Sequence, residues 1–251
     1  MKKLLLIAAV LLVGGVGVAS AKGTSVAWNN CDAATTNPGS PFIMFDCTQN
    51  NGTIYSIFQN FQLDASLTGV IAAQGIVDMT MISDAAVPDW WQVFGGCNDG
   101  SLGFAYVRGT NCAGNSNTFC GTTLTPCSGA GPVAEFIGGT GAYPSAAPNK
   151  ARFVFVLARA STSPVTLAAG KHFLWEIDFL IDNPNAPNSC VGCSDAATLT
   201  ADNLDIFDLS GGTTTITSID AGTPSACANQ TICNAVPVQS KTWGQLKALY
   251  R

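Results

Sequence analysis

The sequence is short of charge. Only 11% of its 251 residues are charged, far below the share of about a quarter that is usual in globular proteins. Lysine and arginine number 11 against 16 aspartates and glutamates, so the formal net charge is −5. So few basic residues provide no electrostatic footprint for nucleic acid and little attraction for anionic lipid. We therefore exclude nucleic acid as a partner of this chain.

Glutamate and histidine, two side chains common in acid–base catalysis, are also scarce. Glu135 and Glu176 are the only glutamates, and His172 is the only histidine. A Ser-His-Asp triad would have to use His172, yet no G-x-S-x-G elbow precedes a helix in this sequence. A lone histidine that begins a strand is usually a surface or edge residue. The sequence therefore favours a protein that is not an enzyme, without excluding one.

One pair of carboxylates resembles a catalytic motif. Glu176 and Asp178 lie two apart on an expected strand, which places both on one face about 7 Å apart. The pattern is similar to the E-x-D-x-E strand of laminarinase-like retaining glycosidases, in which two glutamates act as nucleophile and acid/base. Here Leu180 occupies the second glutamate position, and Ile181 occupies it in the bulged variant. A glycoside hydrolase that uses Glu176 and Asp178 is kept as an alternative function.

What is present begins with an apolar leader. Two lysines precede the uncharged stretch from Leu4 to Val18, and Ala19-Ser20-Ala21 is an A-x-A cleavage site. These parts in this order predict a secretory signal peptide over residues 1–21. The stretch is shorter than the roughly 20 apolar residues that a spanning helix needs, so we expect no membrane insertion. We predict a protein that is secreted, or held in the cell envelope by protein contacts.

Cysteine is plentiful behind this leader. An even count of 10 cysteines in an exported chain predicts disulfides. The residues are Cys31, Cys47, Cys97, Cys112, Cys120, Cys127, Cys190, Cys193, Cys227 and Cys233. The sequence cannot choose among the many pairings, and we expect neighbours to pair, as 31–47, 97–112, 120–127, 190–193 and 227–233. Such short bridges would clamp surface loops more than they hold the core together.

The C-x-x-C of Cys190 and Cys193 has two other interpretations. Redox enzymes place this motif at a helix N-terminus, which lowers the pKa of the thiol, and that context is missing here. A structural zinc site would need a second such pair at suitable spacing, and the sequence has none. We therefore favour a loop disulfide.

Strand patterns dominate the rest of the chain. Asn51-Gly52 separates Phe42–Phe45 from Ile54–Phe58 and predicts a hairpin that sets Phe45 opposite Phe58. Residues 204–209 and 213–219 flank Ser210-Gly211-Gly212, which predicts a second hairpin. Helical periodicity is nearly absent, although Asp89-Trp90-Trp91-Gln92 is typical of a capping box that opens one helical turn.

Three further strands are expected to build the core. Residues 75–82 alternate, with Val77, Met79 and Met81 on one face. Residues 152–157 are a continuous apolar run, which is typical of a central strand buried on both faces. Residues 172–181 alternate again, and the strand period places these side chains on one face: Phe173, Trp175, Ile177, Phe179 and Ile181.

These patterns predict an all-β sandwich as a single domain over residues 22–238, either jelly-roll-like or of the cohesin-like kind that a resemblance of three segments implies. Residues 95–131 lack a strand pattern and contain four cysteines. We interpret them as a long, disulfide-pinned loop between two halves of one sandwich; a boundary between two subdomains is the alternative. Residues 239–251 form a short tail with helical spacing. A tail packed on the domain is expected, and a sorting or docking signal is the alternative.

Two kinds of binding site are considered. Trp90 and Trp91, with Tyr143, are candidates for an aromatic platform that stacks on a sugar ring, although aromatic side chains at a core edge are more often buried. Acidic residues around the late strands are candidate ligands of a structural calcium ion, because Ca²⁺ prefers oxygen ligands. These residues are Asp182, Asp195, Asp202 and Asp205. Ordinary polar turns are the simpler interpretation, and no other cofactor is expected.

Three segments carry a resemblance to a group of secreted bacterial proteins with cohesin-like or carbohydrate-module-like β-sandwiches. The first is Pro88-Asp-Trp-Trp-Gln followed by Cys97 and a Gly-Ser-Leu turn. The second is Cys190-Val-Gly-Cys193 after a strand that ends in Ile181-Asp-Asn183, and the third is the tail Thr242-Trp-Gly-Gln-Leu-Lys-Ala-Leu-Tyr-Arg251. The resemblance implies a fold and an extracellular address. It implies no activity and no catalytic residues.

The sequence therefore predicts a non-catalytic interaction or structural protein, secreted or at the cell surface, whose partner is a protein or a glycan. The neutral polar surface, the cysteines and the missing acid–base arrangements favour this function. A carbohydrate-binding module that uses Trp90, Trp91 or Tyr143 is the first alternative. The hydrolase that uses Glu176 and Asp178 is the second.

Overall fold

The computed structural model describes residues 23–31, 39–48, 52–94, 96–99, 102–105, 117–118, 127–141, 143–181, 190–217, 225–231 and 233. The signal peptide and the tail predicted from the sequence lie outside these residues. In the described part of the chain, no helix is long and apolar enough to cross a membrane.

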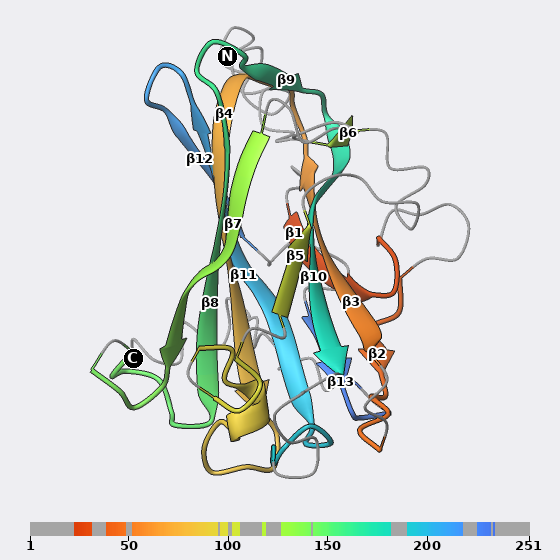
Figure 1. The fold of residues 1–251 in the computed structure, drawn as a ribbon. Coiled ribbons are helices and arrows are strands. Elements are labelled where there is room, and N and C mark those ends of the chain that lie inside the picture. The colour runs from red at the N-terminus through yellow and green to blue at the C-terminus, as the bar shows by residue number, and fades with distance from the viewer. Residues whose placement is uncertain are drawn as a thin grey trace, which may run out of the picture.

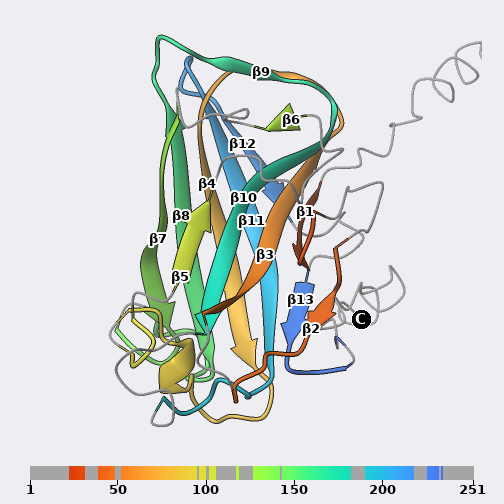
Figure 2. The same cartoon turned by 45° about the vertical axis from the view of Figure 1, so that its right-hand side comes forward.

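Two β-sheets face each other across one core (Figures 1 and 2). The five-stranded sheet has the order β1-β3-β10-β5, with β6 paired to β10. Its strands are β1 (Gly23–Trp28), β3 (Thr53–Leu63), β5 (Leu102–Ala105), β6 (Asn117–Thr118) and β10 (Gly170–Ile181). The predicted all-β sandwich is confirmed.

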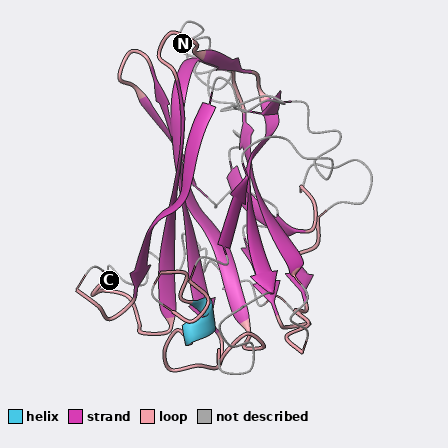
Figure 3. Cartoon of the chain, viewed as in Figure 1, coloured by secondary structure: helices cyan, strands magenta, loops and turns pink. Residues whose placement is uncertain are grey.

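The eight-stranded sheet forms the other layer. Its order is β2-β13-β11-β4-β8-β7, with β12 paired to β11 and β9 paired to β4. Its strands are β2 (Phe42–Ile43), β4 (Leu67–Met81), β7 (Cys127–Ile137), β8 (Lys150–Arg159), β9 (Val165–Leu167), β11 (Ala197–Asp208), β12 (Thr213–Thr217) and β13 (Ser225–Ala228). A 3-10 turn, η1 (Asp89–Trp91), is the one helical element among the described residues (Figure 3).

Alternating side chains build the core as the sequence indicates. Val77, Met79 and Met81 on β4 are fully buried, as predicted. Trp175 on β10 crosses the core and covers Gly75 on β4, where an added Cβ would lie 2.5 Å from the tryptophan ring. Gly75 is therefore required by this close approach of the two sheets.

The predicted hairpin around Asn51-Gly52 is wrong. β2 pairs in parallel with β13 in the eight-stranded sheet, whereas β3 pairs with β1 and β10 in the other sheet. The chain after β2 turns into the core, where the Phe45 ring stacks on Tyr55 with centroids 4.6 Å apart. The packing of Phe45 in the core therefore decides the path of the chain here, and the Asn51-Gly52 dipeptide does not. The second hairpin, β11 with β12, is confirmed.

Two of the predicted faces are wrong. β8 is buried on one face only, because Arg152, Val154 and Val156 are half-buried on the outer side of the sheet. On β10, a register shift between Phe173 and Trp175 moves Phe173 to the outer side, where it packs with Phe58 and Cys31. A bulge adds one residue and so reverses the alternation that the sequence displays.

The stretch predicted as a strandless loop, residues 95–131, contains β5, β6 and the start of β7. The turn at η1 is present, but no capping box forms. Pro88 occupies the N-cap position without a side-chain hydrogen bond, and the Gln92 amide donates to the Val87 carbonyl at 2.9 Å.

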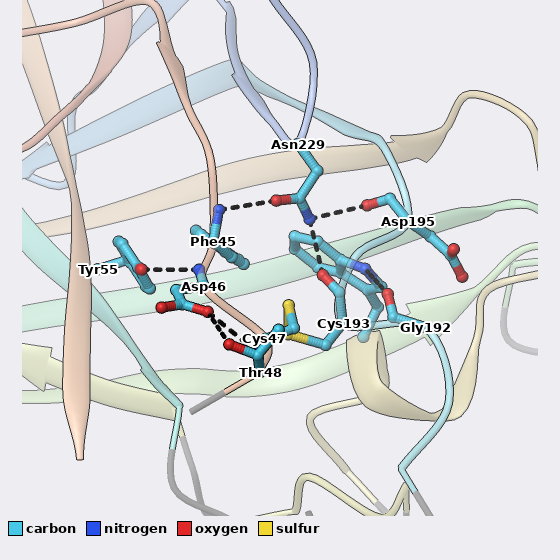
Figure 4. Close-up of a disulfide and its surroundings, with 10 residues drawn as sticks. Phe45, Asp46, Cys47, Thr48, Tyr55, Gly192, Cys193, Asp195 and Asn229 are labelled. Carbon is cyan, nitrogen blue, oxygen red and sulfur yellow. Dashed lines mark hydrogen bonds between the residues drawn. A yellow bond between two sulfur atoms is a disulfide. The ribbon is translucent and has the colours of Figure 1, made fainter. Parts of the chain in front are cut away.

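The disulfides join segments that are distant in sequence. Cys47 is bonded to Cys193 and Cys97 to Cys190, at separations of 146 and 93 residues. In the chain-entropy model, loops of this length give about 5 kcal/mol of stabilisation each, more than the short bridges expected above. Both bridges attach to the segment that precedes β11, and Figure 4 shows the one between Cys47 and Cys193.

The predicted pairings are therefore mostly wrong. The bond between Cys227 and Cys233 is confirmed. The pairings 31–47, 97–112 and 190–193 are excluded by the two long-range bonds. Cys31 is disulfide-bonded, to a cysteine other than Cys47. The predicted 120–127 pairing concerns side chains outside the described part.

Candidate functional site

The outer surface of the eight-stranded sheet, which we call the broad face, belongs to the sheet with more strands. Its side chains come from adjacent strands at matching register positions, such as Ile76 opposite Val154 and Asp78 opposite Arg152. Most are half-buried, and no described strand or helix covers them. The broad face comprises Gln74, Ile76, Asp78, Thr80, Arg152, Val154, Val156, Thr200, Asp202, Asn203, Asp205, Thr213, Thr215 and Thr217.

An ion cluster lies on the broad face near the end of β4 and the start of β8. Arg152 on β8 donates Nε and Nη2 to the two carboxylate oxygens of Asp78, both at 2.7 Å. The same Nη2 donates to Asp202 Oδ2 at 2.9 Å. The ring of Tyr143 lies over the guanidinium, with its centroid 5.1 Å from Cζ. A bidentate pair that also stacks on an aromatic ring fixes the orientation of the arginine.

The charged groups of the cluster, together with their partial burial, shift the pKa values of its members. Hydrogen bonding by Asp78 raises the pKa of Arg152 above its ordinary value, so the guanidinium stays charged. Partial burial raises the pKa of Asp202, and repulsion from Asp78 adds to the effect. Partial burial also raises the pKa of Tyr143, again with a contribution from Asp78. The Asp202 side chain is 46% exposed and is the group most available to a partner.

Tyr143 is the only member of the predicted aromatic platform that reaches the broad face. Trp90 and Trp91 are 4% and 1% exposed, and they pack with Phe45 in the core. Trp91 Nε1 also donates to the Gly192 carbonyl at 2.8 Å. The two tryptophans are therefore core side chains, the placement that is more common for such residues, and they offer no ring face to a sugar.

The predicted calcium ligands are not brought together. Asp202 binds Arg152, and Asp205 accepts a hydrogen bond from Thr215 at 2.6 Å. Asp195 lies beyond the other end of β11, which begins at Ala197, about 26 Å along the strand from Asp205. Asp182 is outside the described residues, among which no group of three or more metal-ligating side chains occurs. A structural calcium ion stays a prediction.

Glu176 and Asp178 lie on the outer side of the five-stranded sheet, on one face as predicted. Ser56 on β3 donates its hydroxyl to Asp178 Oδ1 at 2.5 Å. The Glu176 carboxyl is within hydrogen-bonding reach of both Ser56 and Asp178, and burial raises the pKa of Glu176 to about 7. Retaining glycosidases keep their two carboxyl groups about 5–5.5 Å apart, with the substrate between them. Carboxyl groups that bond each other instead form a proton-sharing pair.

His172 is not the surface residue that the sequence predicts. It is fully buried, and its ring stacks on Phe61 with centroids 4.8 Å apart. Its Nε2 donates to the Ala168 carbonyl at 2.8 Å, so this nitrogen carries a proton in the neutral ring. The bulge in β10 turns His172 to the core side, away from Glu176.

The sequence pattern did not single out Asp78 and Arg152, which form the ion pair of the broad face. Asp78 faces outward in the predicted alternation, but its partner Arg152 opens a run that was interpreted as buried on both faces. Glu135, one of the two glutamates, was also given no role. It accepts hydrogen bonds from the amides of Val93 and Phe94 at 3.3 and 2.9 Å and so joins β7 to the segment after η1. The sequence signal that could have identified these residues is that each is a charged side chain within or beside an apolar strand.

Comparisons with known proteins add no family. No family model matches the sequence, and no curated protein is similar to it. Among solved structures, a cohesin module of a family 33 glycoside hydrolase from Clostridium perfringens is similar over 83% of this chain and 93% of that chain. The identity is 6% and the TM-score 0.36, so this likeness carries no argument about function.

Proposed function

We propose that this chain is a non-catalytic interaction or structural protein that is secreted or works at the cell surface, and that its partner binds the broad face. The supporting observation is the ion cluster of Arg152, Asp78 and Asp202, held by hydrogen bonds of 2.7–2.9 Å amid half-buried apolar and threonine side chains. A rigid surface with a fixed charge pattern in an apolar surround has the features of a binding interface.

The disulfides support the proposed location. Cys47–Cys193 and Cys97–Cys190 join loops that are far apart in sequence, and such bonds persist in oxidising compartments. The leader predicted over residues 1–21 agrees with export. A glycan partner would use Tyr143, the one predicted aromatic ligand residue on the broad face.

A matched pair of lysine substitutions tests the proposed face. Ile76→Lys places a charge beside the ion cluster, and Ile54→Lys makes the same change on the opposite outer face, where Ile54 is 56% exposed. The wild-type and variant proteins are labelled and added to cells of the strain that exports this protein, after its gene has been deleted. The amount retained on the cells is then measured. We expect Ile76→Lys to reduce retention about tenfold or more, and Ile54→Lys to leave it unchanged, with both near-ultraviolet spectra native.

Three results would contradict the proposal or change its class. Equal retention of the two variants would show that the broad face is not the binding surface. Binding to a glycan array that is lost in Tyr143→Ala would identify the domain as a carbohydrate-binding module. Hydrolysis of β-glucan that is lost in Glu176→Gln would make the protein an enzyme.

A further inference from the structure

β12 is an edge strand with a free side. It pairs with β11, and no other strand of the described part pairs with it. Figure 1 shows the hairpin of β11 and β12 at the outer margin of the sheet. An edge strand presents a row of backbone donors and acceptors that can pair with another chain.

The hairpin register identifies the free backbone groups. The Asp208 amide donates to the Gly212 carbonyl at 3.1 Å and closes the hairpin. Because hydrogen-bonded and non-bonded pairs alternate, Thr214 and Ile216 then exchange bonds with β11. The amides and carbonyls of residues 213, 215 and 217 point away from β11, and the side chains of these three threonines are exposed.

The opposite edge of the same sheet is blunted, whereas this one is not. β7 contains a register shift between Ala130 and Ala134, and Pro132 within it has no amide hydrogen. Bulges, prolines and charged side chains are the usual means of preventing edge-to-edge pairing. β12 has the sequence TTTIT, with none of these features.

We propose that a second copy of this chain pairs with β12 in antiparallel orientation, about a two-fold axis that passes beside Thr215. In this register Thr215 faces Thr215 of the other copy, and Thr213 faces Thr217. The outward groups of residues 213, 215 and 217 then form six backbone hydrogen bonds across the axis. Ile216 faces Thr214 of the other copy, and cross-strand pairs of threonine with β-branched residues are favourable.

Charge favours this edge as the contact between copies. Each chain has a formal net charge of −5, so two copies repel each other overall, and a contact surface without carboxylates adds least to that repulsion. β12 is uncharged, and the nearest carboxylate described on the neighbouring strand is Asp205, which accepts the Thr215 hydroxyl. The two Asp205 residues would be separated by three strand spacings, about 14 Å, which exceeds the Debye length of about 8 Å in physiological salt.

The pairing is expected to be weak. A strand of five residues provides a contact smaller than those of stable dimers. We expect a dissociation constant of about 0.1–1 mM, so the dimer forms where the protein is concentrated on a surface. This contact uses the sheet edge and does not depend on the partner of the broad face.

Cysteine crosslinking of the full mature protein tests the register. Residues at the axis form a hydrogen-bonded pair with Cα atoms about 5.5 Å apart, within the range of a disulfide. Thr215→Cys at about 0.5 mM should therefore give about tenfold more crosslinked dimer than Thr213→Cys, whose copies lie about 14 Å apart. A mixture of Thr213→Cys with Thr217→Cys should crosslink as heterodimers.

A cysteine-free pair of variants controls for disulfide exchange. Thr215→Pro removes the outward amide, and Thr215→Val keeps it while losing the same hydroxyl. Sedimentation at up to about 1 mM should show self-association in wild type and Thr215→Val, and none in Thr215→Pro. Equal crosslinking at positions 213 and 215, or a wild-type monomer throughout, would overturn the proposal.

Discussion

Each outer face of the sandwich carries two half-buried carboxylates side by side, and the two pairs are compensated differently. On the broad face, Asp78 and Asp202 share the guanidinium of Arg152. On the opposite face, the Ser56 hydroxyl donates to Asp178, and burial raises the pKa of the neighbouring Glu176 to about 7. A guanidinium keeps its charge at any physiological pH, whereas a shared proton is lost near neutrality.

The two faces therefore respond differently to pH: one has a cation whose charge does not change, and the other has a carboxyl group that titrates near neutrality. The guanidinium of Arg152 is charged at both pH 5 and pH 8, which suits a constant recognition surface. The pair of Glu176 and Asp178 gains a negative charge over the same interval. The difference agrees with the proposed binding by the broad face and predicts a pH-dependent contribution to stability from the opposite face.

The largest effect is expected from removing the guanidinium. Arg152→Met leaves Asp78 and Asp202 facing each other without a cation, and we expect a loss of about 2 kcal/mol in the free energy of unfolding. Urea unfolding at pH 7 measures it. Arg159→Met on the same strand is the matched control, with an expected loss below about 1 kcal/mol. Equal losses in the two variants would show that the cluster has no special role.

The next effect is a pH dependence. The folded-state pKa of Glu176, about 7, lies above its ordinary value of 4.5, so the folded protein binds the extra proton between these values. The contribution of Glu176 to stability is complete below pH 4.5 and is lost as the pH rises through 7.

Glu176→Gln mimics the protonated form and isolates this contribution. We expect wild type and variant to be equally stable near pH 4.5 and the variant to be more stable by about 1 kcal/mol at pH 8, a figure discounted for solvent screening. Urea unfolding across this interval measures the difference. A constant difference between the two proteins would contradict proton sharing.

A smaller effect is expected at Ser56. Ser56→Ala removes the hydroxyl that bonds Asp178 and opposes the rise in the pKa of Glu176. We expect a cost of about 1 kcal/mol and a titration midpoint of Glu176 above that of the wild type, followed by carbon-13 NMR of the carboxyl group. Thr215→Ala, which removes an exposed hydroxyl from Asp205, is the control and should leave this midpoint unchanged.

Salt gives the smallest effect. Raising sodium chloride to 1 M screens partly exposed ion pairs, so we expect wild type to lose a few tenths of a kcal/mol at pH 7. The Arg152→Met variant should not share this loss. A salt effect of the same sign and size in both proteins would show that the cluster is not its source.

Local patterns in the sequence predicted the strands well. The alternation at Val77, Met79 and Met81 and the turn of Ser210-Gly211-Gly212 depend on neighbours in the chain, and both are confirmed. The contacts of Phe45 and of the C-x-x-C cysteines depend on segments far away in the sequence. These residues lie in loops, and their partners could be known only once the strands on either side had been placed.

The candidate site was predicted less well for the same reason. Asp202 and Tyr143 were named, but as a metal ligand and a sugar platform, and Arg152 was missed. The cluster exists because β4, β8 and β11 lie side by side in one register, which no single strand pattern encodes. The outward positions of Glu176 and Asp178 were correct because both lie on one strand beyond its bulge.

Hydroxyl-radical footprinting is the most direct test of the central claim that the partner binds the broad face. The mature protein is oxidised free in solution and while retained on the cells that export it. We predict that oxidation of Tyr143 and Ile76 falls on the cells, while oxidation of Ile54 on the opposite face stays the same. Protection of Ile54 with Tyr143 and Ile76 unchanged would contradict the account.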